Sequence, residues 1–154
     1  MKRIAVLIAA LLLFSCAAAE ALSPYAVKFI ADYNIYADTV FGVPHLPLTG
    51  WACNDFNYKL TEDGIQFDIS VLSEKHIYAD ILIDSATVDG DFIAKCACMA
   101  AALSGSTKGI YDSILTMYFK CRINPSGEQL TLSTNEGYMI MQKEENLFFF
   151  GMGL

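Results

Sequence analysis

The chain is poor in the side chains on which most hydrolytic active sites depend. It has only two histidines, His45 and His76, and neither stands at a recognisable spacing from a serine or cysteine nucleophile. The Gly-x-Ser-x-Gly pattern of a nucleophile elbow is missing. Neighbouring carboxylates such as Glu144-Glu145 fall in a predicted turn, where no apolar wall surrounds them. The sequence therefore predicts a protein that is not an enzyme, with no catalytic residue and no cofactor.

Basic residues are also scarce. The chain has 10 Lys and Arg against 17 Asp and Glu, which gives a formal net charge of −7. The lysines do not cluster, so the basic patch that nucleic acids and anionic membranes require is not expected. Nucleic acid is therefore excluded as a partner, and a membrane is expected to hold this protein only through a lipid anchor. An acidic surface would instead attract a basic macromolecule.

No apolar run in the sequence reaches the roughly 20 residues that span a bilayer. The run at the start, Ile4 to Phe14, has eleven residues and follows the basic pair Lys2 and Arg3. Small residues come next, and Ala19-Glu20-Ala21 fits the small-x-small pattern of a cleavage site. We therefore expect residues 1–21 to be a signal peptide that exports the rest of the chain to the periplasm or the extracellular space.

A second processing route competes with this one. The segment Leu13-Phe14-Ser15-Cys16 resembles the lipobox of bacterial lipoproteins, and cleavage there would leave a lipid on Cys16. A helix start predicted at Ser23 would place such a lipid almost against the folded domain, without the flexible tether that these lipoproteins generally carry. Release of the chain from Leu22 is the favoured route, and a form anchored to the envelope through Cys16 is the alternative.

Residues 22–154 have the length of one domain with a core large enough to fold alone. Without Lys2, Arg3 and Glu20 this part retains 8 Lys and Arg against 16 Asp and Glu, a net charge of about −8. The sequence thus predicts a single small acidic domain.

Four cysteines remain in that domain, and in an oxidising compartment they are expected to form disulfides. A bridge between Cys96 and Cys98 would close a very tight loop, and within a helix these side chains point about 200° apart. Two bridges are therefore predicted, which join one of these residues to Cys53 and the other to Cys121. No metal site is expected, because no Cys-x-x-Cys pair occurs and the histidines are distant from most of the cysteines.

Apolar residues recur at helical spacing in three segments. The first extends over about 23–41 and has the helix-starting pair Ser23 and Pro24. The second begins after Thr87 or Asp89 and ends at Gly105, and the third is capped by Ser106 or Thr107 and stops at Asn124-Pro125.

Apolar residues recur with a period of two in three segments within 55–84, and three more strands are expected within 128–152. Short turns such as Glu62-Asp63-Gly64 separate them, as in antiparallel meanders. We therefore expect an α+β fold: an antiparallel sheet of five or six strands in two meanders, with an N-terminal helix and a central helix pair packed on it. The first two strands have polar residues at alternate positions, so one face of this part of the sheet is expected to be exposed to solvent.

The last two strands are apolar at successive positions, so both of their faces need cover. Helices on both sides, a dimer contact, a ligand or a partner would each supply it. If the surface binds a partner, side chains of one parity, Met139 with Met141 or Tyr138 with Ile140, should line an open groove. The candidate binding surface comprises Tyr138, Met139, Ile140, Met141, Phe148, Phe149 and Phe150.

These observations favour an exported acidic binding module, without enzymatic activity, that recognises an apolar or protein ligand through its C-terminal strands. The alternative is a secreted inhibitor of a basic hydrolase such as a lysozyme, because the domain is small, acidic and rich in paired cysteines. A structural subunit of an envelope assembly is the third hypothesis. A salt-sensitive complex would distinguish the inhibitor, and a large obligate interface would distinguish the subunit.

Overall fold

The computed structural model describes residues 22–73, 76–124, 128–134 and 137–154. The predicted signal peptide and Cys16 therefore lie outside the described residues. Within the described ranges, three α-helices and seven strands form the fold, and a short π-helical segment, η1, extends α2. In chain order the elements are α2 (Pro24–Tyr36), η1 (Ala37–Phe41), β1 (Ala52–Asn54), β2 (Asn57–Glu62), β3 (Ile65–Ser73), β4 (His76–Asp84), α3 (Gly90–Ser104), α4 (Ile110–Ile123), β5 (Gln129–Ser133), β6 (Tyr138–Glu144) and β7 (Leu147–Gly153).

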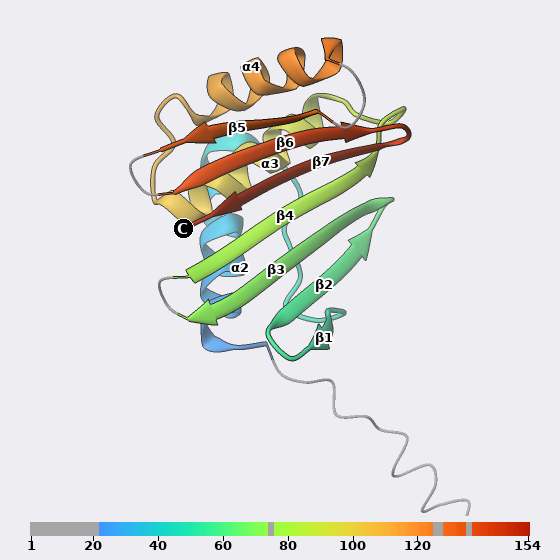
Figure 1. Cartoon of the computed structure of the whole chain (residues 1–154). Helices are drawn as coiled ribbons and strands as arrows, with labels where there is room; N and C mark the ends of the chain where they lie inside the picture. The colour runs from blue at the N-terminus through green and yellow to red at the C-terminus, as the bar shows by residue number, and fades with distance from the viewer. Residues whose placement is uncertain (1–21, 74–75, 125–127, 135–136) are drawn as a thin grey trace, which may run out of the picture.

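All seven strands belong to one antiparallel sheet with the order β1-β2-β3-β4-β7-β6-β5 (Figure 1). Two meanders, β1 to β4 and β5 to β7, meet where β4 pairs with β7. The predicted α+β fold, with two antiparallel meanders and three helices, is confirmed. The sequence prediction missed β1, because a strand of only three residues is too short to show a period of two.

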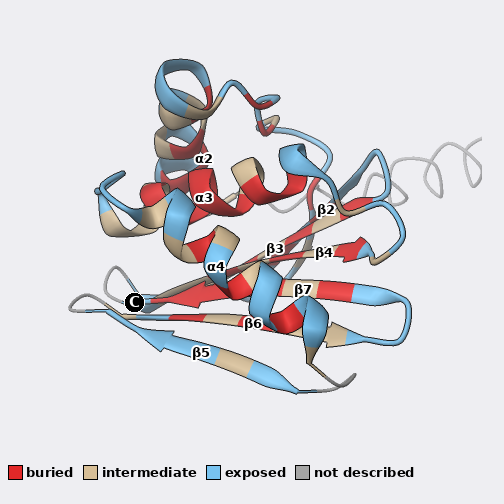
Figure 2. Cartoon of the chain, turned by 90° about the horizontal axis from the view of Figure 1, so that it is seen from above, coloured by how far each residue is buried: buried red, intermediate tan, exposed pale blue. Residues whose placement is uncertain are grey.

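The three helices all lie on one side of the sheet (Figure 2). Local sequence explains where they begin: the Ser23 hydroxyl accepts a hydrogen bond from the Ala26 amide, and the Asp89 carboxylate accepts one from the Phe92 amide. The third helix differs from the prediction. It begins later, after Gly109, whose φ of 71° is left-handed, so neither Ser106 nor Thr107 caps it.

The core fills the space between these helices and the sheet. Alternate residues of β3 face it, since Ile65, Phe67, Ile69 and Val71 are buried while the residues between them are not. The Phe92 ring of α3 meets Phe148 of β7 edge to face, with ring centroids 6.1 Å apart. The core of the described structure therefore lies on one face of the sheet, and no helix of the described residues covers the other face.

None of the helices within the described ranges is long and apolar enough to cross a membrane.

Candidate functional site

The two faces of β6 and β7 divide the candidate binding surface into two groups. Met139, Met141, Phe148 and Phe150 face the helices and are at most 3 % exposed. The prediction that these four belong to a binding surface is wrong, because they form the core beneath α3 and α4. Tyr138, Ile140 and Phe149 have the opposite parity and lie on the face that none of the described helices covers, which we call the open face.

Strand β4 adds two side chains to the apolar part of the open face. The register aligns Leu82 with Phe149, and Tyr78 and Tyr138 both align with Gly153 of the strand between them. A small hollow of about 170 Å³ lies at one end of this region, lined by Leu82, Gln142, Glu144, Leu147 and Phe149. Tyr138 is 42 % exposed, and Leu147 and Glu144 are also exposed. The remaining side chains of this region are half-buried: Tyr78, Leu82, Ile140, Gln142 and Phe149. We call Tyr78, Leu82, Tyr138, Ile140 and Phe149 the apolar half of the open face.

Two glycines of β7 allow the aromatic rings to lie against the sheet. A Cβ on Gly151 would overlap the Tyr78 hydroxyl and approach the Phe149 ring to 2.9 Å. A Cβ on Gly153 would come within 3.0 Å of the Tyr138 ring. Real side chains essentially never make contacts as short as those at Gly151, and a contact of 3.0 Å at Gly153 is tighter than most, so the rings lie in space that these glycines leave free. The rings of the apolar half thus lie close to the backbone of the sheet, and this half extends across β4, β7 and β6.

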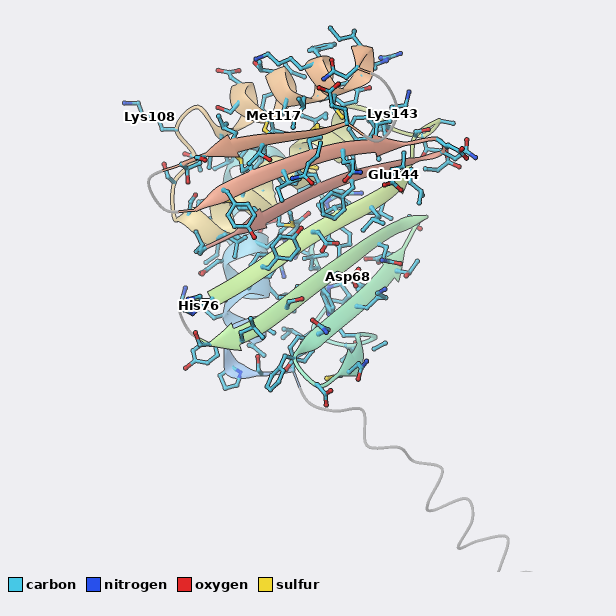
Figure 3. The ribbon with its side chains drawn as sticks, viewed as in Figure 1. Asp68, His76, Lys108, Met117, Lys143 and Glu144 are labelled. Carbon is cyan, nitrogen blue, oxygen red and sulfur yellow. The ribbon has the colours of Figure 1, made fainter. Side chains whose placement is uncertain are left out.

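The other half of the open face, over β2 and β3, is polar. It contains a larger hollow of about 450 Å³, lined by Ala52, Cys53, Asn54, Asn57, Lys59, Asp68, Ser70 and Asp80. The register places Lys59, Asp68 and Asp80 in one row across three neighbouring strands. Asp68 is seen in Figure 3 on the side of the sheet that faces the viewer. We call this hollow, with its eight lining residues, the polar hollow.

Asp80 lies at the boundary between the two halves. Its neighbour in the row on one side is Asp68, and on the other side it is Gly151, which has no side chain. One carboxylate oxygen of Asp80 is buried and has no hydrogen-bond partner among the described residues. Burial, together with the adjacent Asp68, raises the pKa of Asp80 to about 7, against the opposite effect of Lys59. Asp80 therefore changes its charge near neutral pH.

Asp80 also affects its neighbour on β4. Burial raises the pKa of Tyr78 above its ordinary value, and the carboxyl of Asp80 raises it further. Tyr78 thus remains a neutral phenol that can donate a hydrogen bond at physiological pH.

Sequence reasoning found three residues of the open face and missed Asp68, Asp80, Tyr78 and Leu82. One signal was present: Asp80 is the only charged residue between His76 and Asp84, in a strand that is otherwise apolar. The partners of Asp80 could not be identified in this way, because Gly151 comes 71 positions later in the chain.

Three of the four cysteines lie deep in the core on α3 and α4. Cys96, Cys98 and Cys121 carry separate thiols, with no bridge among them in the described structure. Burial raises the pKa of the Cys98 thiol to about 12, and this thiol donates a hydrogen bond to the Tyr33 carbonyl oxygen at 3.1 Å. Cys53 lies apart from them on edge strand β1. The two disulfides stay a prediction, which peptide mapping under non-reducing conditions would test.

The histidines lie outside the open-face hollows. His45 Nε2 is 2.7 Å from a carboxylate oxygen of Asp38, and His76 Nδ1 is 2.9 Å from the Ser73 hydroxyl. Both histidines are exposed. Within the described ranges, no three His, Cys, Asp or Glu side chains gather where they could hold a metal ion.

Comparisons of the chain with family models, with curated proteins and with solved structures find no significant match.

Proposed function

We propose that this protein is an exported, non-enzymatic binding module that holds a protein ligand against the open face of its sheet. The observation that carries the proposal is the apolar half of this face. An antiparallel sheet with one buried face commonly presents polar side chains to water on the other, and β2 and β3 follow this rule. The half-buried Ile140, Phe149 and Leu82 break the rule on adjacent strands, and a contiguous apolar patch at the surface is typical of an interaction site.

The form of the face favours a protein over a small molecule as the ligand. Strand β4 separates the two hollows, with Asp80 in one and Leu82 in the other. A small ligand is usually enclosed in one concave pocket, whereas a protein surface can contact apolar and polar regions side by side. The aromatic side chains of Tyr78, Tyr138 and Phe149 are also the type that contributes most binding energy at protein interfaces.

Affinity capture from the exported fraction of the producing cell tests the proposal when it is combined with matched variants. Ile140→Asp places a charge in the apolar half, and Phe119→Asp places the same charge on α4, where Phe119 is 56 % exposed. A partner that the wild type and Phe119→Asp capture, and that Ile140→Asp loses at unchanged melting temperature, supports the proposal. Equal capture by all three proteins would refute it.

A secreted inhibitor of a basic hydrolase is the second candidate function. The observation that favours it is the acidic character of the polar hollow, where Asp68 and Asp80 face the single cation Lys59, in a chain of net charge −7. Inhibition of a basic lysozyme that weakens steeply as salt rises would support this function. Full lysozyme activity in the presence of excess protein at low salt would exclude that enzyme as the target.

A further inference from the structure

The small hollow beside Phe149 places apolar and acidic groups side by side at one end of the apolar half. The register puts Leu147, which is 47 % exposed, between Asp84 of β4 and Glu144 of β6. Both carboxylates are exposed. A hollow of about 170 Å³ is smaller than the roughly 300 Å³ or more of small-ligand pockets, so it fits a single apolar side chain of a larger partner.

The charges of the open face are predominantly acidic. Strand positions of this parity within the described ranges hold four carboxylates, on Asp68, Asp80, Asp84 and Glu144, and one cation, Lys59. Lys59 lies 3.6 Å from the Asp68 carboxylate, so these two charges offset each other. The other described cations lie on the helices, in the loop before α4 or at a helix-facing position of β6: Lys28, Lys95, Lys108, Lys120, Arg122 and Lys143. The face that surrounds the apolar half therefore favours a cationic partner.

The dimensions of the apolar half match an α-helix. It extends over three strands, and spacings of about 4.8 Å between neighbouring strands make it roughly 10 Å wide, which is the diameter of a helix with its side chains. From Tyr138 to Glu144 it is roughly 20 Å long, the length of about 14 helical residues. Strands β4, β7 and β6 each pair with a neighbour on both sides, so they offer no free edge to an added strand.

The opposite face of the same strands shows what covers them within this chain. There α3 packs against β7 and α4 packs against β6 (Figure 2). Because the side chains of β6 and β7 are apolar on both faces, a helix on the open face would repeat this arrangement on the other side of the sheet.

We propose that the apolar half of the open face binds a basic amphipathic α-helix of the partner protein. An apolar side chain of that helix enters the hollow beside Leu82 and Phe149, and its lysine or arginine side chains lie opposite Asp84 and Glu144. This inference rests on the proposed function, since it names the kind of partner that the open face holds.

The apolar contact and the charges have different effects in this complex. Burial of the apolar stripe of the helix supplies most of the affinity. Ion pairs with exposed carboxylates such as Asp84 and Glu144 add little free energy each, but they speed the encounter and fix the orientation. A helix of the same shape with acidic side chains would bring like charges together and is rejected.

An NMR titration of the purified protein with three synthetic peptides of about 14 residues tests this inference. The first peptide has leucine at helical spacing and lysine elsewhere. The second has the same leucines and glutamate in place of lysine, and the third has the composition of the first with leucine and lysine in strict alternation, which favours a strand. We expect saturable shifts of the Leu82, Ile140 and Phe149 amide signals with the first peptide alone.

A matched pair of charge reversals tests the acidic rim. Glu144→Lys should weaken binding of the first peptide by about fivefold or more at low salt, because it replaces an attraction with a repulsion. Asp112→Lys makes the same change of net charge at an exposed position of α4, on the other side of the sheet. It should change binding by less than about twofold, since the solvent screens distant charges.

Each of the other outcomes would overturn the inference. These are equal binding of the glutamate peptide or the alternating peptide, shifts confined to another surface, equal weakening by Glu144→Lys and Asp112→Lys, and no saturable binding of any peptide. A dimer in sedimentation that Ile140→Asp dissociates would also overturn it, because the occupant would then be a second copy of this chain.

Failure of this inference is distinguishable from failure of the proposed function. If Glu144→Lys retains the partner captured from the producing cell and Ile140→Asp loses it, the open face binds a partner and only the basic helix is wrong. If Ile140→Asp retains the partner as well, the proposed function fails.

Discussion

The two faces of β6 and β7 have similar hydrophobicity and opposite surroundings. On one face Met141 and Phe150 are fully buried beneath the helices, and on the other Ile140 and Phe149 remain half-exposed beside Tyr138. The first face stabilises the fold, because burying apolar area contributes about 25 cal/mol per Å². The second face gains less from folding, and we propose that a partner covers its apolar side chains. The comparison shows that apolar composition alone does not distinguish a buried face of a sheet from an uncovered one.

Alanine substitution of adjacent phenylalanines should give the largest difference between the two faces. Phe150→Ala removes a ring that is 0 % exposed, and we expect it to lower the free energy of unfolding by about 3 to 5 kcal/mol. Phe149→Ala should lower it by only about 1 kcal/mol, because much of that ring is in water already. Chemical denaturation measures both values. If the two variants lost equal free energy of unfolding, the two faces would not differ in their contribution to stability.

Replacement of Asp80 should stabilise the protein in a pH-dependent way. The carboxyl titrates near 3.8 when unfolded and near 7 when folded, so between these pH values the folded state binds more protons. Stability therefore falls as pH rises from about 4 to about 7, and then stays constant. Asp80→Asn removes this fall, so at pH 8 it should be more stable than the wild type by on the order of 2 to 4 kcal/mol.

The same experiment contains its own control, because below about pH 4 both proteins carry a neutral group at position 80 and should have similar stability. Asp112→Asn should change stability by less than about 1 kcal/mol at either pH, since Asp112 is an exposed residue in the first turn of α4. A loss of stability in Asp80→Asn at pH 8 would mean that this carboxylate is structural.

A methyl group on Gly151 should disturb the open face without affecting the core. The new Cβ would overlap the Tyr78 hydroxyl, so the Tyr78 and Phe149 rings must move away from the sheet. We expect Gly151→Ala to cost about 1 kcal/mol of stability and to change the ring-proton shifts of both aromatic residues. A gain in stability with unchanged ring shifts would show that the rings do not approach β7 as described.

Substitution of Tyr138 should have the smallest effect on folding. The side chain is 42 % exposed and only its ring approaches Gly153, so Tyr138→Ser should cost less than about 1 kcal/mol. Its effect on partner capture should nevertheless match that of Ile140→Asp, because both residues belong to the apolar half. Unchanged capture would restrict the binding surface to Ile140, Phe149 and β4.

The sequence contained enough information for the helices, most strands and the fold class. Alternation fixed the buried parity of β3, and the left-handed φ angles of Asp63 and Gly64, 50° and 78°, fit the predicted hairpin turn. The buried parity of β6 could not be deduced in the same way, since Met139 and Ile140 are both apolar. That choice depends on which side the helices pack, a tertiary property that no local pattern encodes.

The residues around Asp80 could not be identified from the sequence for a related reason. Their importance comes from neighbours on other strands, and the register that brings Asp80 beside Gly151 and Asp68 appears only in the folded sheet. The late start of α4 also depends on backbone geometry at Gly109, where the sequence offered better capping residues one turn earlier.

Site-specific photocrosslinking in the producing cell tests the central claim most directly. A photoreactive phenylalanine analogue at position 149 would lie on the open face, and the same analogue at position 119 would lie on the exposed side of α4. Because both positions are phenylalanine in this chain, the two substitutions are closely matched. Our account expects one discrete protein adduct from position 149 and none from position 119. An adduct from position 119 alone, or no adduct from position 149 in cells that produce the protein at its native level, would contradict it.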